Sequence, residues 1–136
     1  MTAKQPTMLC LAMLLVAGTV DAHHSLGMFD MQKTTTLQGT VSKFEWTNPH
    51  AWVWVAVTNA QGESEEWGLE MAALAMLRRG GYTKDSFRAG EKVTVELHPV
   101  KDGRNGGAFI RATFADGRTV GRAPGAGPPG AAGQQQ

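Results

Sequence analysis

Apolar and polar residues alternate along several stretches of this chain, which is the period of β-strands with one buried face. The clearest stretch is Glu91–Val100, where apolar residues occupy every second position. The same period indicates strands over 36–46, 50–58, 64–69 and 108–114. Within 91–100 we expect Val93, Val95 and Leu97 to point inward, and Lys92, Thr94, Glu96 and His98 to point outward.

The first of these strands contains a change of phase. Its apolar positions are Leu37, Gly39 and Val41, but they continue at Phe44 and Trp46. A slip of one residue inside a long strand is typical of a β-bulge, and bulges bend the strands that close small barrels. The pattern therefore predicts a long, bent first strand.

Asn48-Pro49 interrupts the chain between the first and second strands, because proline lacks an N–H and favours extended geometry in the residue before it. The second strand is expected from His50 to Thr58. Its alternation places His50, Trp52 and Trp54 on one face and three valines on the other. We expect the valines to form core, so the histidine and the two indoles mark the face to inspect for function.

The stretch Met71–Arg79 has apolar residues at helical spacing, two arginines in its last turn, and Gly80-Gly81 after it. It predicts one short helix. Three strands, a helix and two strands is the order of an OB-like fold, a mainly β, five-stranded barrel with one short helix between strands 3 and 4. A small α+β sheet of another topology is the alternative. In the fifth strand we expect Ala108, Ile110, Ala112 and Phe114 inward, and a short segment, 118–120, to follow.

The two ends of the chain have different compositions from its middle. Residues 1–22 combine Lys4, an apolar run over 8–18 and small residues at 20–22, which predicts a cleaved secretory signal peptide, with an uncleaved anchor as the alternative. Residues 121–136 are Gly, Pro, Ala and Gln with one arginine, which predicts a disordered tail. The domain is then 23–120, periplasmic or secreted, with no membrane span after cleavage.

Composition narrows the range of partners. The chain has 13 Lys and Arg against 12 Asp and Glu, a balance that provides no electrostatic footprint for nucleic acid. Its single cysteine, Cys10, lies in the predicted signal peptide, so the mature domain would have neither disulfides nor thiol chemistry. A metal ion or a small ligand is the expected partner, and the sequence names no protein partner.

Several motifs together resemble a family of small exported bacterial proteins known as a domain of unknown function. They are the Ala-His-His-Ser start of the mature chain, Phe29-Asp30, the block from Gly39 to His50 that ends in Asn-Pro-His, the Arg-Arg-Gly helix end, and His98-Pro99 followed by Asp102-Gly103. The resemblance covers nearly all of 22–120, and Trp54 departs from it. It implies export and a β-rich fold, and it assigns no catalytic residue.

Cleavage after Ala22 would make His23 the first residue, with a free α-amine and an imidazole that both lose protons near neutral pH. Together with the ring of His50 or His24 they would supply three nitrogens in a T, an arrangement that favours Cu(II). Copper is therefore the predicted metal, and Met28 and Met31 are soft ligands suited to Cu(I). Cleavage before Asp21 would instead place His23 third, where amine, two amides and imidazole wrap Cu(II) in a plane.

Each of these residues also has a structural interpretation. Paired histidines at a chain start are often only solvated, and methionines often fill gaps in packing. His50 is as suited to holding the turn through a backbone carbonyl as to binding a metal. For His98, a solvent-facing histidine is the better interpretation.

The tryptophans Trp46, Trp52 and Trp54 suggest a second function. In OB-folds the face of strands 2 and 3 binds ligands, and exposed indoles stack on sugars or bases. Since the domain is not basic, an oligosaccharide or peptide is the expected ligand. The alternative is that the N-terminal arm, 23–33, anchored by Leu26 and Phe29, covers Trp52 and Trp54.

An enzyme is the less favoured interpretation, because no nucleophile with a nearby base stands out and the acidic residues near strand 3 are typical of a solvated edge. The sequence therefore predicts an exported small binding protein that holds copper through His23, His24 and His50. The second prediction is a ligand or protein interaction module that uses the tryptophans and no metal.

Overall fold

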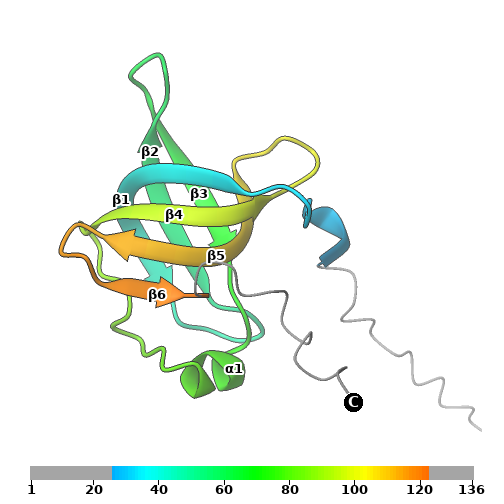
Figure 1. Cartoon of the computed structure of the whole chain (residues 1–136), viewed down its shortest axis with the longest axis vertical. Coiled ribbons are helices and arrows are strands. Elements are labelled where there is room, and N and C mark those ends of the chain that lie inside the picture. The colour runs from blue at the N-terminus through cyan, green and yellow to red at the C-terminus, as the bar shows by residue number, and fades with distance from the viewer. Residues whose placement is uncertain (1–25, 123–136) are drawn as a thin grey trace, which may run out of the picture.

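A computed structural model describes residues 26–122 as a β-barrel with one short α-helix at one end (Figure 1). The predicted signal peptide, the histidines at positions 23 and 24, and the predicted tail from residue 123 lie outside the described residues. In order, the elements are η2 (Leu26–Met28), β1 (Thr35–Glu45), β2 (Trp52–Thr58), β3 (Ser64–Glu70), α1 (Leu74–Arg79), β4 (Lys92–Pro99), β5 (Gly106–Phe114) and β6 (Thr119–Gly121).

The strands close on themselves in the order expected of an OB-like barrel. Antiparallel pairs join β3 to β2, β2 to β1, β1 to β4 and β4 to β5, and β6 adds to the outer side of β5. A parallel pairing of Gly68–Glu70 with Gly106–Ala108 completes the ring between β3 and β5. The predicted fold is confirmed: the protein is mainly β, with five strands in a closed barrel and α1 between β3 and β4.

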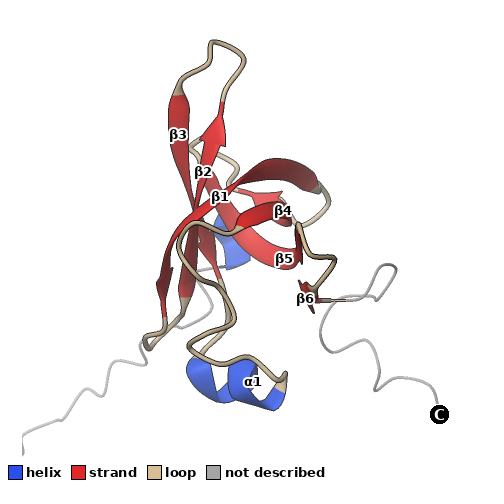
Figure 2. Cartoon of the chain, turned by 90° about the vertical axis from the view of Figure 1, so that its left-hand side faces the viewer, coloured by secondary structure: helices blue, strands red, loops and turns tan. Residues whose placement is uncertain are grey.

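The β2–β3 hairpin continues past the barrel at the end opposite α1 (Figure 2). Its tip is ordered by the side chain of Asn59, whose carbonyl oxygen accepts hydrogen bonds from the backbone of Gln61 and Glu63. The amide of Asn59 donates to Glu65, so the turn is held by its own side chains.

Bulges set the curvature of the barrel. The register between β1 and β2 shifts between Val41 and Lys43, where the sequence predicted a change of phase. On the N-terminal side of this bulge Thr40 and Val41 still pair with β2, and Thr35 to Thr40 pair with β4. One strand thereby belongs to both halves of the barrel, which explains its length.

A second bulge makes one sequence prediction wrong. The register between β4 and β5 shifts at Glu96 and Leu97, which pair with Arg111 and Phe109 and leave Ile110 as the extra residue. Ala108 and Ile110 therefore do not face the interior as predicted, and Phe109 packs on the core instead. The strict alternation failed because an inserted residue reverses the faces of the residues before it.

The barrel interior is filled by branched aliphatic side chains closed off by an aromatic plug. Phe87, on the connector after α1, lies with its ring centroid 5.1 Å from Phe44, 5.7 Å from Phe109 and 5.6 Å from Phe114. Burial of this apolar surface is the main source of stability in a domain without cysteines. The largest fully buried side chains are Val41, Val53, Val55, Leu69, Val95 and Leu97.

The helix is shorter than predicted. Met71 and Ala72 still exchange backbone hydrogen bonds with Ala51, so they extend the β2–β3 ladder, and α1 begins only at Leu74. The Leu74 N–H is accepted by the side chain of Asn48, 3.4 Å away in the β1–β2 loop. Helical spacing in 71–73 misled the prediction because pairing with a neighbouring strand outweighs local propensity.

The described part of the N-terminal arm lies along the end of β4. Phe29 forms a bridge with Val100, the Asp30 N–H donates to Pro99, and the Lys101 N–H donates to Met28. Phe29 is buried outside the cluster that fills the barrel, so it anchors the arm as predicted.

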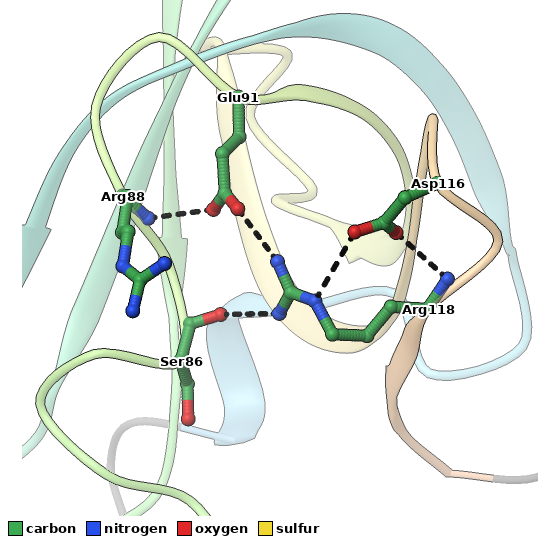
Figure 3. Close-up of polar contacts among 5 residues, drawn as sticks. All are labelled: Ser86, Arg88, Glu91, Asp116 and Arg118. Carbon is green, nitrogen blue, oxygen red and sulfur yellow. Dashed lines mark hydrogen bonds and ion pairs between the residues drawn. The ribbon is translucent and has the colours of Figure 1, made fainter.

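A cluster of polar contacts ties the connector after α1 to the β5–β6 turn (Figure 3). The Arg118 guanidinium pairs with Glu91 at 2.6 Å and donates to the Ser86 carbonyl at 3.1 Å, and its backbone N–H donates to Asp116. Glu91 also accepts the Arg88 N–H at 2.7 Å. These contacts hold the segment that carries the Phe87 plug.

Candidate functional site

The outer faces of β2 and β3 bring together most of the residues that the sequence singled out. His50, Trp52 and Trp54 follow each other at alternate positions, and cross-strand pairing places Trp52 opposite Glu70 and Trp54 opposite Gly68. All three side chains are partly exposed. In an OB-like barrel this is the face that binds ligands.

Trp52 and Trp54 form a stacked pair on this face. Their ring centroids lie 6.0 Å apart with an interplanar angle of 23°. The Trp54 ring packs directly over Gly68, where an added Cβ would lie only 2.7 Å from the ring. The absence of a side chain at position 68 therefore determines how closely the Trp54 ring lies on β3. We call the stacked pair of Trp52 and Trp54 the indole platform.

His50 lies at one end of this platform and is bound to a nearly buried carboxylate. Its Nδ1 donates to Oε1 of Glu70, since an ionised carboxylate can only accept. The side chain of Glu70 is 10% exposed and that of His50 is 37% exposed. Because Nδ1 is occupied, Nε2 carries the free lone pair of the neutral ring, which makes it the nitrogen able to bind a metal.

Glu45 and Lys43 lie on the same outer face, on the β1 side of the indoles. Hydrogen bonding from Lys43 is the main cause that lowers the pKa of Glu45 below its ordinary value of 4.5. The buried Trp54 N–H forms no hydrogen bond of normal geometry with a described residue, so we regard Lys43 as the partner that orders Glu45. The platform is thus flanked by charges of both signs.

Trp46 lies apart from the other two tryptophans. It packs against Phe44 at 5.7 Å between centroids, and the Arg78 guanidinium lies 5.7 Å from the centroid of its ring. With Tyr82 and Lys84 it lines an open pocket of about 450 Å³ near the end of α1. Burial raises the pKa of Tyr82 to about 12. The predicted group of three indoles is therefore two indoles on one face and a third at the helix.

His98 has the same kind of anchor as His50, on a different strand. Its Nδ1 donates to the backbone carbonyl of Lys33 at 2.8 Å. The arm is thereby connected to β4 through a side chain as well as through the backbone. As for His50, no residue within 26–122 forms a hydrogen bond with Nε2 of His98.

A second open pocket, of about 570 Å³, is lined mainly by residues of β1, β2, β4 and β5 and involves none of the predicted site residues. Polar groups dominate its lining, and the Lys92 ammonium donates to the Thr40 hydroxyl there at 2.8 Å. The pocket is lined by Gln38, Gly39, Thr40, Ala56, Thr58, Lys92, Val93, Thr94, Thr113, Phe114 and Ala115.

Within residues 26–122, no group of three His, Cys, Asp or Glu side chains is close enough to hold a metal ion. Of the three predicted ligands, only His50 lies in this range, and His23 and His24 lie outside the described residues. The structure brings His50 together with Trp52 and Trp54 but tests no metal role for it.

Sequence reasoning missed the importance of Glu70. It was grouped with Glu63, Glu65 and Glu66 as a solvated edge, whereas its side chain is nearly buried against His50. Only the register of β2 against β3 reveals the pair, because it places Glu70 beside the residues at the start of β2. The signal in the sequence that could have pointed to Glu70 is its spacing of two residues from Gly68, which puts both residues on the outward face of the strand.

The arm does not cover β2 in the way the sequence alternative proposed, as far as it is described. The backbone hydrogen bonds of residues 28–30 go to Pro99 and Lys101, and Trp52 and Trp54 remain partly exposed. Within the same described range, no helix has the length and apolar character that crossing a bilayer requires.

A family model described as "Family of unknown function (DUF6152)" matches residues 11–110, so the chain belongs to this family. No curated protein matches the chain, and no solved structure matches it either. The predicted resemblance to a family of unknown function is confirmed at that level, and the family description assigns no activity.

Proposed function

We propose that this protein is an exported copper-binding protein that holds Cu(II) between its processed N-terminus and the outer face of the barrel. The observation that supports this function best is the contact between His50 and Glu70. Histidines that ligate metals usually donate their second ring N–H to a carboxylate or carbonyl, which fixes the tautomer and the ring orientation. His50 has this arrangement, with a free Nε2 on a partly exposed ring.

The remaining ligands of the proposed site come from the chain start. Cleavage after Ala22 gives His23 an α-amine and an imidazole, and His24 offers a second ring. Two nitrogens from His23 and one from His50 complete a T of three nitrogen ligands, and nitrogen ligation of this kind suits Cu(II). Export, signal cleavage and the metal are all parts of the proposal.

The central experiment measures copper binding by the exported protein. Mass spectrometry of the secreted product first gives its N-terminal residue, and a Cu(II) titration followed by EPR then reports the ligands. We expect an axial, nitrogen-rich spectrum that weakens in His23→Ala and in His50→Ala. His98→Ala is the matched control, because His98 is also a partly exposed barrel histidine with an anchored Nδ1.

Two outcomes would contradict the proposal. One is an N-terminus well downstream of residue 23. The other is a Cu(II) affinity that His50→Ala leaves unchanged.

Glu70→Gln tests the role of the carboxylate separately from the ligand. Loss of an outer partner of a metal-bound histidine typically weakens metal binding by about 10–100-fold. Cu(II) bound at His50 should also quench Trp52, which lies on the same face, so fluorescence provides the titration signal. Glu66→Gln is the control, since Glu66 is also outward on β3 but accepts its hydrogen bond from Ser42. An equal effect of both variants on Cu(II) affinity would show that Glu70 has no specific role.

The stacked indoles support a second candidate function, the binding of a flat-faced ligand such as an oligosaccharide. A pair of parallel rings held by Gly68 presents apolar area beside polar groups, which is how sugar rings are bound. Soluble oligosaccharides such as cellohexaose and chitohexaose would then quench fluorescence saturably, and Trp52→Ala would abolish this. Trp46→Phe is the control, because Trp46 lies at α1 instead.

A further inference from the structure

The open pocket beside the end of α1 is a concave site that neither proposed function uses. Its volume of about 450 Å³ is typical of sites for small molecules. Its lining comes from three segments, which are the residue after β1, the last turn of α1 and the connector that follows α1. The lining residues are Trp46, Arg78, Gly81, Tyr82, Thr83 and Lys84. None of them belongs to the proposed Cu(II) site or to the indole platform.

Two aromatic rings give this pocket an apolar wall that is already in place. Trp46 and Tyr82 are both partly buried and pack against the barrel core. The Tyr82 N–H donates to the Leu77 carbonyl at 3.0 Å, which holds the connector against the end of α1. Because burial raises the pKa of Tyr82 to about 12, its hydroxyl stays protonated at neutral pH and can donate a hydrogen bond to a ligand.

Two cationic residues line the same pocket. The Arg78 guanidinium lies 5.7 Å from the centroid of the Trp46 ring, so a positive charge and an aromatic face are adjacent. Arg78 and Lys84 are both exposed, and neither forms an ion pair with a carboxylate of residues 26–122. Asp85 follows Lys84 in the sequence but does not line the pocket. In the described part of the chain, the pocket therefore has positive charge without a counter-ion.

Positive charge is concentrated around α1 and the connector. The segment 78–88 contains four cationic residues and one acidic residue, Asp85, in a chain whose net charge is only +1. The β2–β3 hairpin, at the end of the barrel opposite α1, instead has acidic residues at 63, 65 and 66 (Figure 2). A small anion is therefore attracted to the α1 end and repelled from the hairpin. The cationic residues are Arg78, Arg79, Lys84 and Arg88.

We propose that this pocket binds a small organic anion in which a carboxylate or phosphate is joined to a flat ring. The planar fork of the Arg78 guanidinium matches the oxygens of either head group, and Lys84 adds a second charge. The ring of the ligand lies against Trp46 and Tyr82. This site goes beyond the proposed function, since it needs neither a metal nor a processed chain start.

The experiment follows the indole N–H NMR resonances of the metal-free protein, which report each tryptophan separately. We expect phenylacetate to shift the Trp46 resonance saturably and to leave those of Trp52 and Trp54 unchanged. Phenylacetamide lacks the charge and acetate lacks the ring, so each should bind at least tenfold more weakly. Phenyl phosphate distinguishes the head groups: binding of either ring-bearing anion supports the site, and the tighter one identifies the head group.

Charge substitutions then test the pocket itself. Arg78→Gln should weaken binding about tenfold or more, because a hydrogen-bonded charge pair is lost. Arg79→Gln is the matched control, since Arg79 has the same charge in the same helical turn but does not line the pocket. Equal losses in both variants, equal binding of phenylacetate and phenylacetamide, or no shift at Trp46 would each overturn the proposal. Since no metal is present, failure of the Cu(II) proposal would leave these results unchanged.

Discussion

The inner and outer faces of β2 and β3 are built from alternate residues of the same two strands, yet they follow different rules. Inward, Val53, Val55 and Leu69 are fully buried aliphatic residues in a continuous core. Outward, the residues that alternate with them are aromatic, charged or glycine, and they pack against or pair with particular residues. Side-chain volume therefore determines which residues fit the inner face, whereas specific pairs of residues determine the outer face.

This contrast decides where chemistry can occur. A core residue is interchangeable with another of similar size and polarity, because its contribution is mainly transfer from water and dispersion. On the outer face, His50 with Glu70 and Trp54 with Gly68 depend on the identity of both partners. The effects of substitutions on the two faces should therefore differ in kind as well as in size.

The largest expected effect is on the inner face. Leu69→Ala removes a fully buried side chain and leaves a cavity, which should lower the free energy of unfolding by about 2–5 kcal/mol. Urea denaturation followed by far-UV circular dichroism measures this. Cu(II) affinity of the fraction that remains folded should be unchanged, and a specific loss of affinity would break the division between the faces.

The next effect concerns the adjacent residue on the outer face. Gly68→Ala places a methyl group within 2.7 Å of the Trp54 ring, which should cost about 1–3 kcal/mol and alter the near-UV spectrum of the indoles. The double variant with Trp54→Leu should recover most of the loss, because the clash is with that ring. Equal costs in both backgrounds would show that Gly68 is required for backbone reasons instead.

The smallest effect concerns the charges beside the indoles. The pKa of Glu45 is lowered mainly by Lys43, so the stabilising effect of its carboxylate is present above the ordinary value of 4.5 and disappears as pH falls through the lowered pKa. Glu45→Gln should therefore be slightly less stable than the parent at pH 7, with the gap closing in acid. Lys43→Gln should remove the pH dependence of that gap, and a gap that persists in acid would contradict the assignment.

The sequence predicted the inner face well because one physical rule governs it. Period-two alternation identified Val53, Val55, Val93, Val95 and Leu97, and the phase slip at 41–44 located the first bulge. In β5 the same rule failed at Ile110, since nothing in the local residues announces an extra residue when small and large apolar groups alternate there. Likewise, Met71 and Ala72 looked helical because their strand partner, Ala51, is distant in sequence.

The outer face could be predicted only in part. Alternation correctly put His50, Trp52 and Trp54 on one side, but it says nothing about which residue of another strand lies opposite. The Glu70 partner of His50 and the Lys33 partner of His98 both depend on register between distant segments. Trp46 was grouped with the other two indoles, but it lies against Phe44 and Arg78 instead.

The contacts of Met28 and Phe29 with the end of β4 also limit how far from that point a processed N-terminus can lie. Position 23 is four Cα–Cα steps from Gly27, and an extended chain of four steps spans about 14 Å. Under the proposed cleavage after Ala22, the N-terminal amine could therefore reach a metal only within that distance of the end of β4, where Met28 and Phe29 are held. Inserting residues between the cleavage site and Met28 would lower the effective concentration of the amine near the barrel without changing any ligand. The affinity of the proposed copper site should therefore fall as this segment becomes longer.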